Sequence, residues 1–156
     1  MRKLLVLLSA LGLAGTLYAA DSFTGTWKFD AAKSKFECGP APKEITMVER
    51  KEGSMTDMTV TGTNANGEPV AIHLTYPTNG GPVKFPGGKP PLTGATYAVK
   101  KVNANTGRVT AMRDGKEIWR EKITVSADGR TTQSVRTRML PNGKPWCTDV
   151  ATFERQ

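Results

Sequence analysis

The residues that could do chemistry in this chain are few and far apart. His73 is the only histidine, which excludes a pair of catalytic histidines and a metal site with several histidine ligands. No serine lies in the nucleophile-elbow motif of a Ser-His-Asp hydrolase. The two cysteines, Cys38 and Cys147, form no Cys-x-x-Cys motif, which argues against structural zinc. The sequence therefore predicts no catalytic residue, no metal and no cofactor, and favours a protein that is not an enzyme.

Glu121 is the sharpest candidate for a polar binding group. It shares one face of the predicted strand 116–126 with Trp119, and a carboxylate on an apolar face needs a partner because a lone buried charge is costly. Arg136 or Arg138, on the next strand, could supply that partner, and so could a polar group of a ligand. Alternatively, a bulge of one residue would turn Glu121 outward.

Aromatic residues on apolar strand faces are the other candidates for a binding site. Tyr76 ends a strand in which every second residue is apolar, and Tyr97 and Trp119 also share faces with aliphatic neighbours. These side chains could line a cavity, or they could fill the core of a small barrel. His73 lies on the opposite face from Tyr76 and is expected to be exposed. The predicted ligand-binding residues are Tyr76, Tyr97, Trp119, Glu121, Val135 and Arg136.

The elements that must position these residues begin after a leader. Residues 1–20 combine a basic start (Arg2 and Lys3), an apolar run too short to span a membrane and small residues for cleavage, which together predict a signal peptide. An uncleaved N-terminal anchor is the alternative. We expect one domain at 21–156, periplasmic or secreted. Because Arg2 and Lys3 are lost, its formal net charge is +6, compared with +8 for the whole sequence.

The basic residues of 21–156 are scattered along the chain. They form no run of about five like charges and do not alternate with aromatic residues, as in proteins that bind single-stranded nucleic acid. The sequence therefore predicts a solvated surface and no nucleic-acid partner, with attraction to anionic envelope surfaces as the alternative. No transmembrane segment is expected after removal of the leader, and the oligomeric state is left open.

The pattern beyond the leader is strand, turn, strand. Nine alternating stretches are separated by Asn-Gly, Asp-Gly and similar turns, and an edge strand at 83–85 would make ten. Residues 30–34 predict one short helical turn, with Asp30 as its cap. The segment 77–94 contains five prolines and five glycines, which predict an exposed loop at one end of the molecule. Because no helix is long enough to cover a sheet, we expect an all-β fold, an antiparallel up-and-down barrel of eight to ten strands.

The cysteines bear on this topology. In a closed meander the first and last strands are antiparallel neighbours, which brings Cys38, shortly after the first strand, near Cys147 at the start of the last. An even number of cysteines in an exported chain favours a disulfide. We therefore predict a Cys38–Cys147 bond that pins the seam of the barrel. Two free buried thiols are the alternative.

The two ends of the predicted domain resemble the calycins, the superfamily of lipocalins and intracellular fatty-acid-binding proteins. The stretch 23–29, Phe-Thr-Gly-Thr-Trp-Lys-Phe, is similar to the first calycin strand. Residues 114–117 (Asp-Gly-Lys-Glu) and 152–155 (Thr-Phe-Glu-Arg) are similar to the C-terminal half of fatty-acid-binding proteins. The resemblance implies a barrel that holds a small apolar ligand.

The resemblance also carries expectations for individual residues. It implies structural roles for Gly25 and Trp27, with Trp27 at the closed end of the barrel. Fatty-acid-binding proteins hold the carboxylate with an Arg-x-Tyr in the last strand, whereas the matching positions here are Ala151 and Phe153. A fatty acid held in that manner is therefore not expected. The Gly-Thr-Trp-Lys opening and the Lys-Ser-Lys at 33–35 also resemble small exported bacterial lipocalin-like proteins of unknown function.

These patterns lead to an expected function. We expect an exported protein that holds a small, largely apolar molecule inside a β-barrel. A structural or interaction module of the cell envelope, with a filled core and no ligand, is the alternative, and an enzyme is the least favoured class. A cavity larger than about 300 Å³ with few polar groups would distinguish the first from the second.

Overall fold

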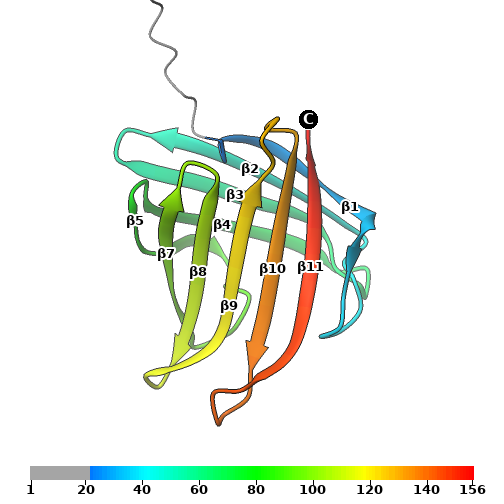
Figure 1. The fold of residues 1–156 in the computed structure, drawn as a ribbon, viewed down its shortest axis with the longest axis vertical. Helices are drawn as coiled ribbons and strands as arrows, with labels where there is room; N and C mark the ends of the chain where they lie inside the picture. The colour runs from blue at the N-terminus through cyan, green and yellow to red at the C-terminus, as the bar shows by residue number, and fades with distance from the viewer. Residues whose placement is uncertain (1–21) are drawn as a thin grey trace, which may run out of the picture.

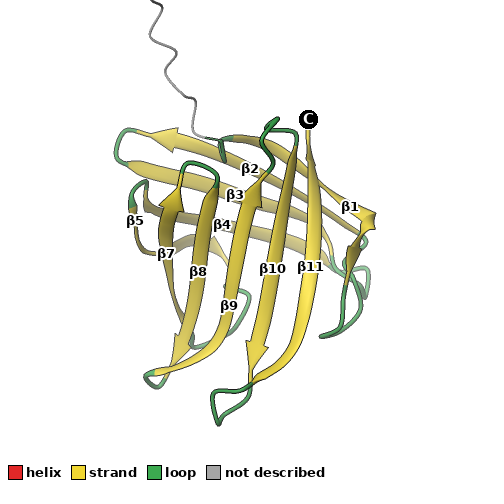
Figure 2. Ribbon diagram, in the orientation of Figure 1, coloured by secondary structure: helices red, strands yellow, loops and turns green. Residues whose placement is uncertain are grey.

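Residues 22–156 are described by a computed structural model, and they form strands joined by turns, without a helix (Figure 2). The all-β prediction is confirmed for this part of the chain, while the predicted signal peptide at 1–20 lies outside the described residues. The described part accordingly contains no helix long and apolar enough to cross a membrane. Its eleven strands are β1 (Gly25–Lys35), β2 (Glu44–Glu52), β3 (Met55–Thr63), β4 (Pro69–Pro77), β5 (Gly80–Pro82), β6 (Lys84–Gly88), β7 (Thr96–Asn103), β8 (Thr106–Arg113), β9 (Lys116–Val125), β10 (Thr131–Met139) and β11 (Pro145–Arg155).

All the strands belong to one antiparallel sheet that curves into a nearly closed barrel (Figure 1). Their order is β5-β7-β8-β9-β10-β11-β1-β2-β3-β4-β6, so strands adjacent in sequence are neighbours almost throughout. The first and last strands pair at the seam, with Trp27 opposite Arg155. The predicted up-and-down arrangement is confirmed, but the described residues form eleven strands instead of the predicted eight to ten.

The Pro/Gly-rich segment 77–94 supplies the two short strands β5 and β6, of which β6 overlaps the edge strand predicted at 83–85, while β5 was not predicted and the rest of the segment is loop. β5 pairs with β7 and β6 pairs with β4, so the segment crosses between the two margins of the sheet and nearly closes the barrel. Val83 and Phe85 are partly buried and alternate with the exposed Pro82 and Pro86. Proline is tolerated because β5 and β6 are edge strands, paired on one side only.

The predicted helical turn at 30–34 does not form. These residues belong to β1, where the ladder with β11 is interrupted between Asp30 and Lys35. Asp30 Oδ1 accepts hydrogen bonds from the backbone N–H groups of Ala32, at 3.0 Å, and Lys33, at 3.3 Å. Asp30 therefore accepts these backbone hydrogen bonds inside an irregular strand and not at the start of a helix. Pairing with β11 resumes at Lys35.

A disulfide between Cys38 and Cys147 confirms the predicted pairing, with the two Cα atoms 5.3 Å apart. Cys38 follows β1 and Cys147 lies near the start of β11, so the bond joins the two strands of the seam. Asp149 adds to this junction. Its Oδ1 accepts hydrogen bonds from the backbone N–H groups of Glu37, at 2.9 Å, and Cys38, at 2.8 Å. The connection between β1 and β2 is thereby fixed against the barrel wall.

Two clusters of buried side chains occupy the interior. The Trp27 cluster lies where β1 begins and β11 ends, and the Trp119 cluster lies on the neighbouring strands β7, β8 and β9. Val83 and Phe85 of the Pro/Gly-rich segment pack against the second cluster. The Trp27 cluster consists of Trp27, Val125 and Phe153, and the Trp119 cluster consists of Tyr97, Ala111 and Trp119.

Candidate ligand-binding cavity

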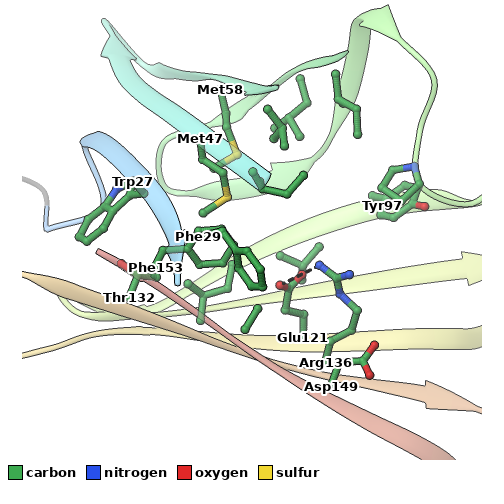
Figure 3. A pocket seen from close by; sticks show the side chains of 18 of the residues that line it. Trp27, Phe29, Met47, Met58, Tyr97, Glu121, Thr132, Arg136, Asp149 and Phe153 are labelled. Carbon is green, nitrogen blue, oxygen red and sulfur yellow. Dashed lines mark hydrogen bonds and ion pairs between the residues drawn. The ribbon is translucent and has the colours of Figure 1, made fainter. Parts of the chain in front are cut away.

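The barrel is hollow between the Trp27 cluster and the Trp119 cluster. The cavity has a volume of about 540 Å³, within the range of sites that bind small molecules. Figure 3 shows Trp27 and Tyr97 on opposite sides of it. Inward apolar side chains such as Met47 and Leu74 are only partly buried, because they face this space. The described residues therefore do not form the densely packed core that a filled barrel requires.

Strands β2, β3 and β4 supply much of the apolar lining. Their alternation places every second residue inside, and the register sets these residues side by side. Met47 lies opposite Val60, which in turn lies opposite Ile72, and Met58 lies opposite Leu74. Figure 3 shows Met47 and Met58 side by side at the cavity. Because methionine is flexible and polarisable, this wall can adapt to the shape of an apolar guest.

The wall formed by β9 and β10 carries a polar group. Arg136 Nη2 lies 3.4 Å from Glu121 Oε1 (Figure 3), and the Ser134 hydroxyl donates a hydrogen bond to the same oxygen. Glu121 and Arg136 stand directly opposite each other in the ladder. The guanidinium also stacks on Trp119, with its Cζ 4.8 Å from the ring centroid. Glu121 therefore faces inward, and Arg136 is the partner that its position requires.

A second polar pair lies on the side of β2 and β4. Tyr76 donates a hydrogen bond to Glu49 Oε1 at 3.1 Å, and Glu49 is only 7% exposed. Sequence reasoning missed Glu49. The signal was available, because Glu49 continues the alternation of Ile45 and Met47 and so belongs to the inner face.

Asp149 is a further lining carboxylate that the sequence analysis missed. It is 5% exposed and lies opposite Arg136 in the ladder. Its hydrogen bonds to the backbone of Glu37 and Cys38 give it a structural role at the disulfide. No strand pattern could reveal this role, because the partners are backbone groups of a connecting segment.

Arg155 packs on the Trp27 cluster and ties it to nearby backbone groups. Its guanidinium lies over the Trp27 ring, with Cζ 4.2 Å from the centroid, and donates hydrogen bonds to three backbone carbonyls. Gly25 makes room for it, because a side chain there would come within 2.5 Å of Arg155 Nη1. The structural roles expected of Gly25 and Trp27 thus have a physical basis. The three carbonyls belong to Ser22, Thr24 and Gly129.

Tyr97 lies in the Trp119 cluster, with its ring 5.3 Å from that of Phe85 and 5.5 Å from that of Trp119. Its hydroxyl accepts a hydrogen bond from the Leu92 backbone N–H at 2.8 Å. Burial raises the pKa of the Tyr97 phenol, and the Leu92 hydrogen bond offsets this only in part. The neutral phenol therefore anchors the end of the Pro/Gly-rich segment to the cavity wall.

Five of the six predicted ligand-binding residues line the cavity, and Val135 does not. Its neighbours Ser134 and Arg136 both contact Glu121 inside the barrel, so alternation turns Val135 to the other face. Val135 was predicted to lie on the inward apolar face of its strand, but the inward positions of β10 are held by polar residues instead. The five lining residues are Tyr76, Tyr97, Trp119, Glu121 and Arg136.

His73 lies away from the cavity lining, and its side chain is 39% exposed. It is paired there, with Nε2 2.5 Å from Asp57 Oδ2 on the neighbouring strand β3. Among residues 22–156, no group of three or more histidine, cysteine, aspartate or glutamate side chains could hold a metal ion.

Comparisons with known proteins leave the fold and the cavity as the guides to function. No protein-family model matches the sequence, and no curated protein matches it. The fold and cavity define a class: a nearly closed antiparallel β-barrel with an interior space, compatible with a calycin-like fold.

Proposed function

We propose that this protein is an exported binding protein that holds a small, largely apolar molecule inside its barrel. The observation that carries the proposal is the cavity of about 540 Å³, lined mainly by apolar side chains. Burying an apolar guest there is favourable, at about 25 cal/mol for each Å² of apolar surface removed from water. Among the polar side chains of the lining, the Glu121–Arg136 and Tyr76–Glu49 pairs are fixed groups that can orient a ligand in such a site.

Export is part of the proposal. The Cys38–Cys147 disulfide suits an oxidising compartment, and the pattern of residues 1–20 is typical of a signal peptide. We therefore place the protein in the periplasm or outside the cell. The intact mass of protein recovered from the producing cells is expected to correspond to a chain that begins near Asp21. A mass that retains residues 1–20 would contradict cleavage.

A fluorescence titration with Nile red, an uncharged apolar probe, tests the binding function. We expect saturable binding and quenching of tryptophan fluorescence. Trp119→Phe should remove much of the quenching, because Trp119 lines the cavity. Trp146→Phe should leave it unchanged, because Trp146 is 61% exposed and lies outside the lining.

A matched pair of valine variants locates the probe. Val60 lines the cavity, whereas Val48, on the neighbouring strand β2, does not. Val60→Trp should fill part of the space and weaken Nile red binding about tenfold or more, and Val48→Trp should bind like the parent protein. Circular dichroism checks that both variants fold.

Failure of the folded, disulfide-bonded protein to bind Nile red or any other apolar probe would favour the envelope-module alternative. Native mass spectrometry of protein purified from its source would then decide whether a ligand is carried at all, because a bound molecule adds its own mass to the complex.

A further inference from the structure

Arg138 brings a positive charge to the inner face of β10 that no carboxylate of the described residues neutralises. It follows Arg136 by two positions, so alternation places both side chains inside, and both line the cavity. Arg136 pairs with Glu121 at 3.4 Å, whereas Arg138 has neither an ion pair nor a side-chain hydrogen bond among residues 22–156. Glu121 therefore serves one of the two arginines, and the other is left without a counter-ion.

The residues that face Arg138 across the ladder carry no charge. They are Trp119 on β9 and Cys147 on β11. Asp149 lies diagonally across the ladder, opposite Arg136, but its Oδ1 accepts two backbone hydrogen bonds from the segment between β1 and β2. Asp149 thereby fixes that segment and forms no ion pair with Arg138.

The guanidinium of Arg138 is accessible to a guest. The residue is only partly buried, and none of its nitrogens is among the shielded polar atoms that lack a hydrogen bond. Arg136 Nε, in contrast, is shielded. A charge that is partly removed from water is costly without a partner, and a guanidinium has only donors to offer. The group that complements Arg138 is therefore an anion with oxygen acceptors, such as a carboxylate or a sulfate ester.

The charges of the whole lining also favour an anionic guest. Four basic and three acidic side chains line the cavity. Arg108, like Arg138, has no acidic partner among the described residues, but it is exposed, so water solvates its charge. Arg138 is half-buried and cannot rely on water to the same extent. The basic lining residues are Lys101, Arg108, Arg136 and Arg138, and the acidic ones are Glu49, Glu121 and Asp149.

We propose that the ligand carries one anionic head group, bound by Arg138, on an otherwise apolar body. The inference rests on the proposed binding function and specifies the polar end of the ligand. The head-group site lies on β10, apart from Ala151 and Phe153 of the last strand, which offer no cation. The apolar body then lies against the wall that contains Met47 and Met58 (Figure 3).

Four probes with the same number of carbon atoms in the chain test this chemistry: undecanoate, undecyl sulfate, 1-undecanol and undecylammonium. Each displaces Nile red from the disulfide-bonded protein, below the concentration at which the probe forms micelles. We expect at least one of the two anions to bind about tenfold more tightly than 1-undecanol, because hydrogen bonds between charged groups give about that factor. The tighter anion identifies the head group. Undecylammonium should bind most weakly, because its charge repels Arg138.

The variant Arg138→Met removes the guanidinium without leaving a partner unpaired. It should lower the affinity for the tighter anion about tenfold, to that for 1-undecanol, and leave 1-undecanol unchanged. Unchanged binding of 1-undecanol also shows that the variant folds. Arg120→Met is the matched control for the loss of one positive charge. Arg120 is 54% exposed, pairs with Glu117 and lies outside the cavity lining, so its loss should change none of the four affinities.

Two further variants separate the charge of Arg138 from its size. Arg138→Lys keeps the positive charge and should still bind the tighter anion more strongly than 1-undecanol. Arg138→Glu reverses the charge, so undecylammonium should then bind more tightly than either anion. An order of affinities that stays the same in Arg138→Glu would contradict a head group held at this position.

The outcomes separate this inference from the proposed function. If 1-undecanol or undecylammonium binds the parent protein as tightly as both anions, the anionic head group is overturned while the binding function stands. A preference for an anion that survives in Arg138→Met would overturn Arg138 as the residue that binds it. Failure of Nile red and of all four probes to bind the folded protein would overturn the binding function itself.

Discussion

Gly25 shows how one residue type controls the packing around Arg155 and Trp27. It has φ +139, and an added Cβ would lie 2.5 Å from Arg155 Nη1. Gly25→Ala should therefore lower the free energy of unfolding by about 2–3 kcal/mol, from backbone strain and disturbed hydrogen bonds of Arg155. Urea unfolding measures the loss. Gly39→Ala is the control, because Gly39 has a comparable φ of +155 but open space around an added Cβ. Equal losses of free energy in both variants would mean that the contact with Arg155 contributes nothing to the effect of Gly25→Ala.

Tyr97 predicts a dependence of stability on alkaline pH. Burial raises the pKa of its phenol above the ordinary value of about 10. Between that value and the raised pKa, the unfolded chain loses the proton while the folded chain keeps it. The stabilising contribution is therefore complete below pH 10 and is lost as the pH rises through the folded pKa. Tyr97→Phe should remove this part of the alkaline decline in urea-unfolding experiments. An identical pH profile in the variant would contradict the assignment.

The disulfide is the covalent link between the strands of the seam. Cys38 and Cys147 are separated by 109 residues, and closing a loop of that length contributes at most about 4–5 kcal/mol in the chain-entropy description. The double variant Cys38→Ser with Cys147→Ser should lose a large part of this in urea unfolding. Dithiothreitol should destabilise the parent protein to a similar extent and leave the double variant unchanged. A loss below about 1 kcal/mol would show that the β1–β11 ladder holds the seam alone.

The short strands β5 and β6 are the weakest part of the barrel wall. β5 pairs through Gly80–Pro82 only, and the pairing of β6 with β4 is irregular between His73 and Thr75. Amide hydrogen exchange should therefore be faster in 80–88 than in β9 and β10, which are paired on both sides. Mass spectrometry of exchanged peptides measures this difference. Equal protection would show that the crossing segment is held as firmly as the central strands.

For the molecule as a whole, the sequence predicted the regular parts of the fold better than the irregular ones. Alternation located the long strands and the inward position of Tyr76, but it left the direction of Glu121 open, because a bulge of one residue would have turned that side chain outward. In the segment 77–94 the edge strand at 83–85 was predicted but β5 was missed, because β5 is only three residues long and the composition around it favours a loop. Val135 was predicted to line the cavity and does not, for a related reason. The polar residues on either side of it take the inward positions, and their mutual contacts are a tertiary property.

The cavity makes the stability of the whole barrel depend on its ligand. Only six hydrophobic residues among those described are buried, so the sheet encloses space that a guest can fill. A ligand that binds the folded state alone, at a hundred times its dissociation constant, adds about 2.7 kcal/mol to the free energy of unfolding. For a domain of this size the midpoint of thermal unfolding should then rise by about 10 °C.

Circular dichroism at increasing concentrations of Nile red measures this rise in the midpoint. The midpoint should keep rising with the logarithm of ligand concentration. The reason is that the stabilising free energy of binding to the folded state continues to grow with ligand concentration after the site is saturated. Val60→Trp, which fills part of the cavity, should show a much smaller rise than Val48→Trp. A constant midpoint in protein that still binds the probe would mean that the probe binds the unfolded chain as tightly as the folded barrel, because only preferential binding to the folded state shifts the midpoint.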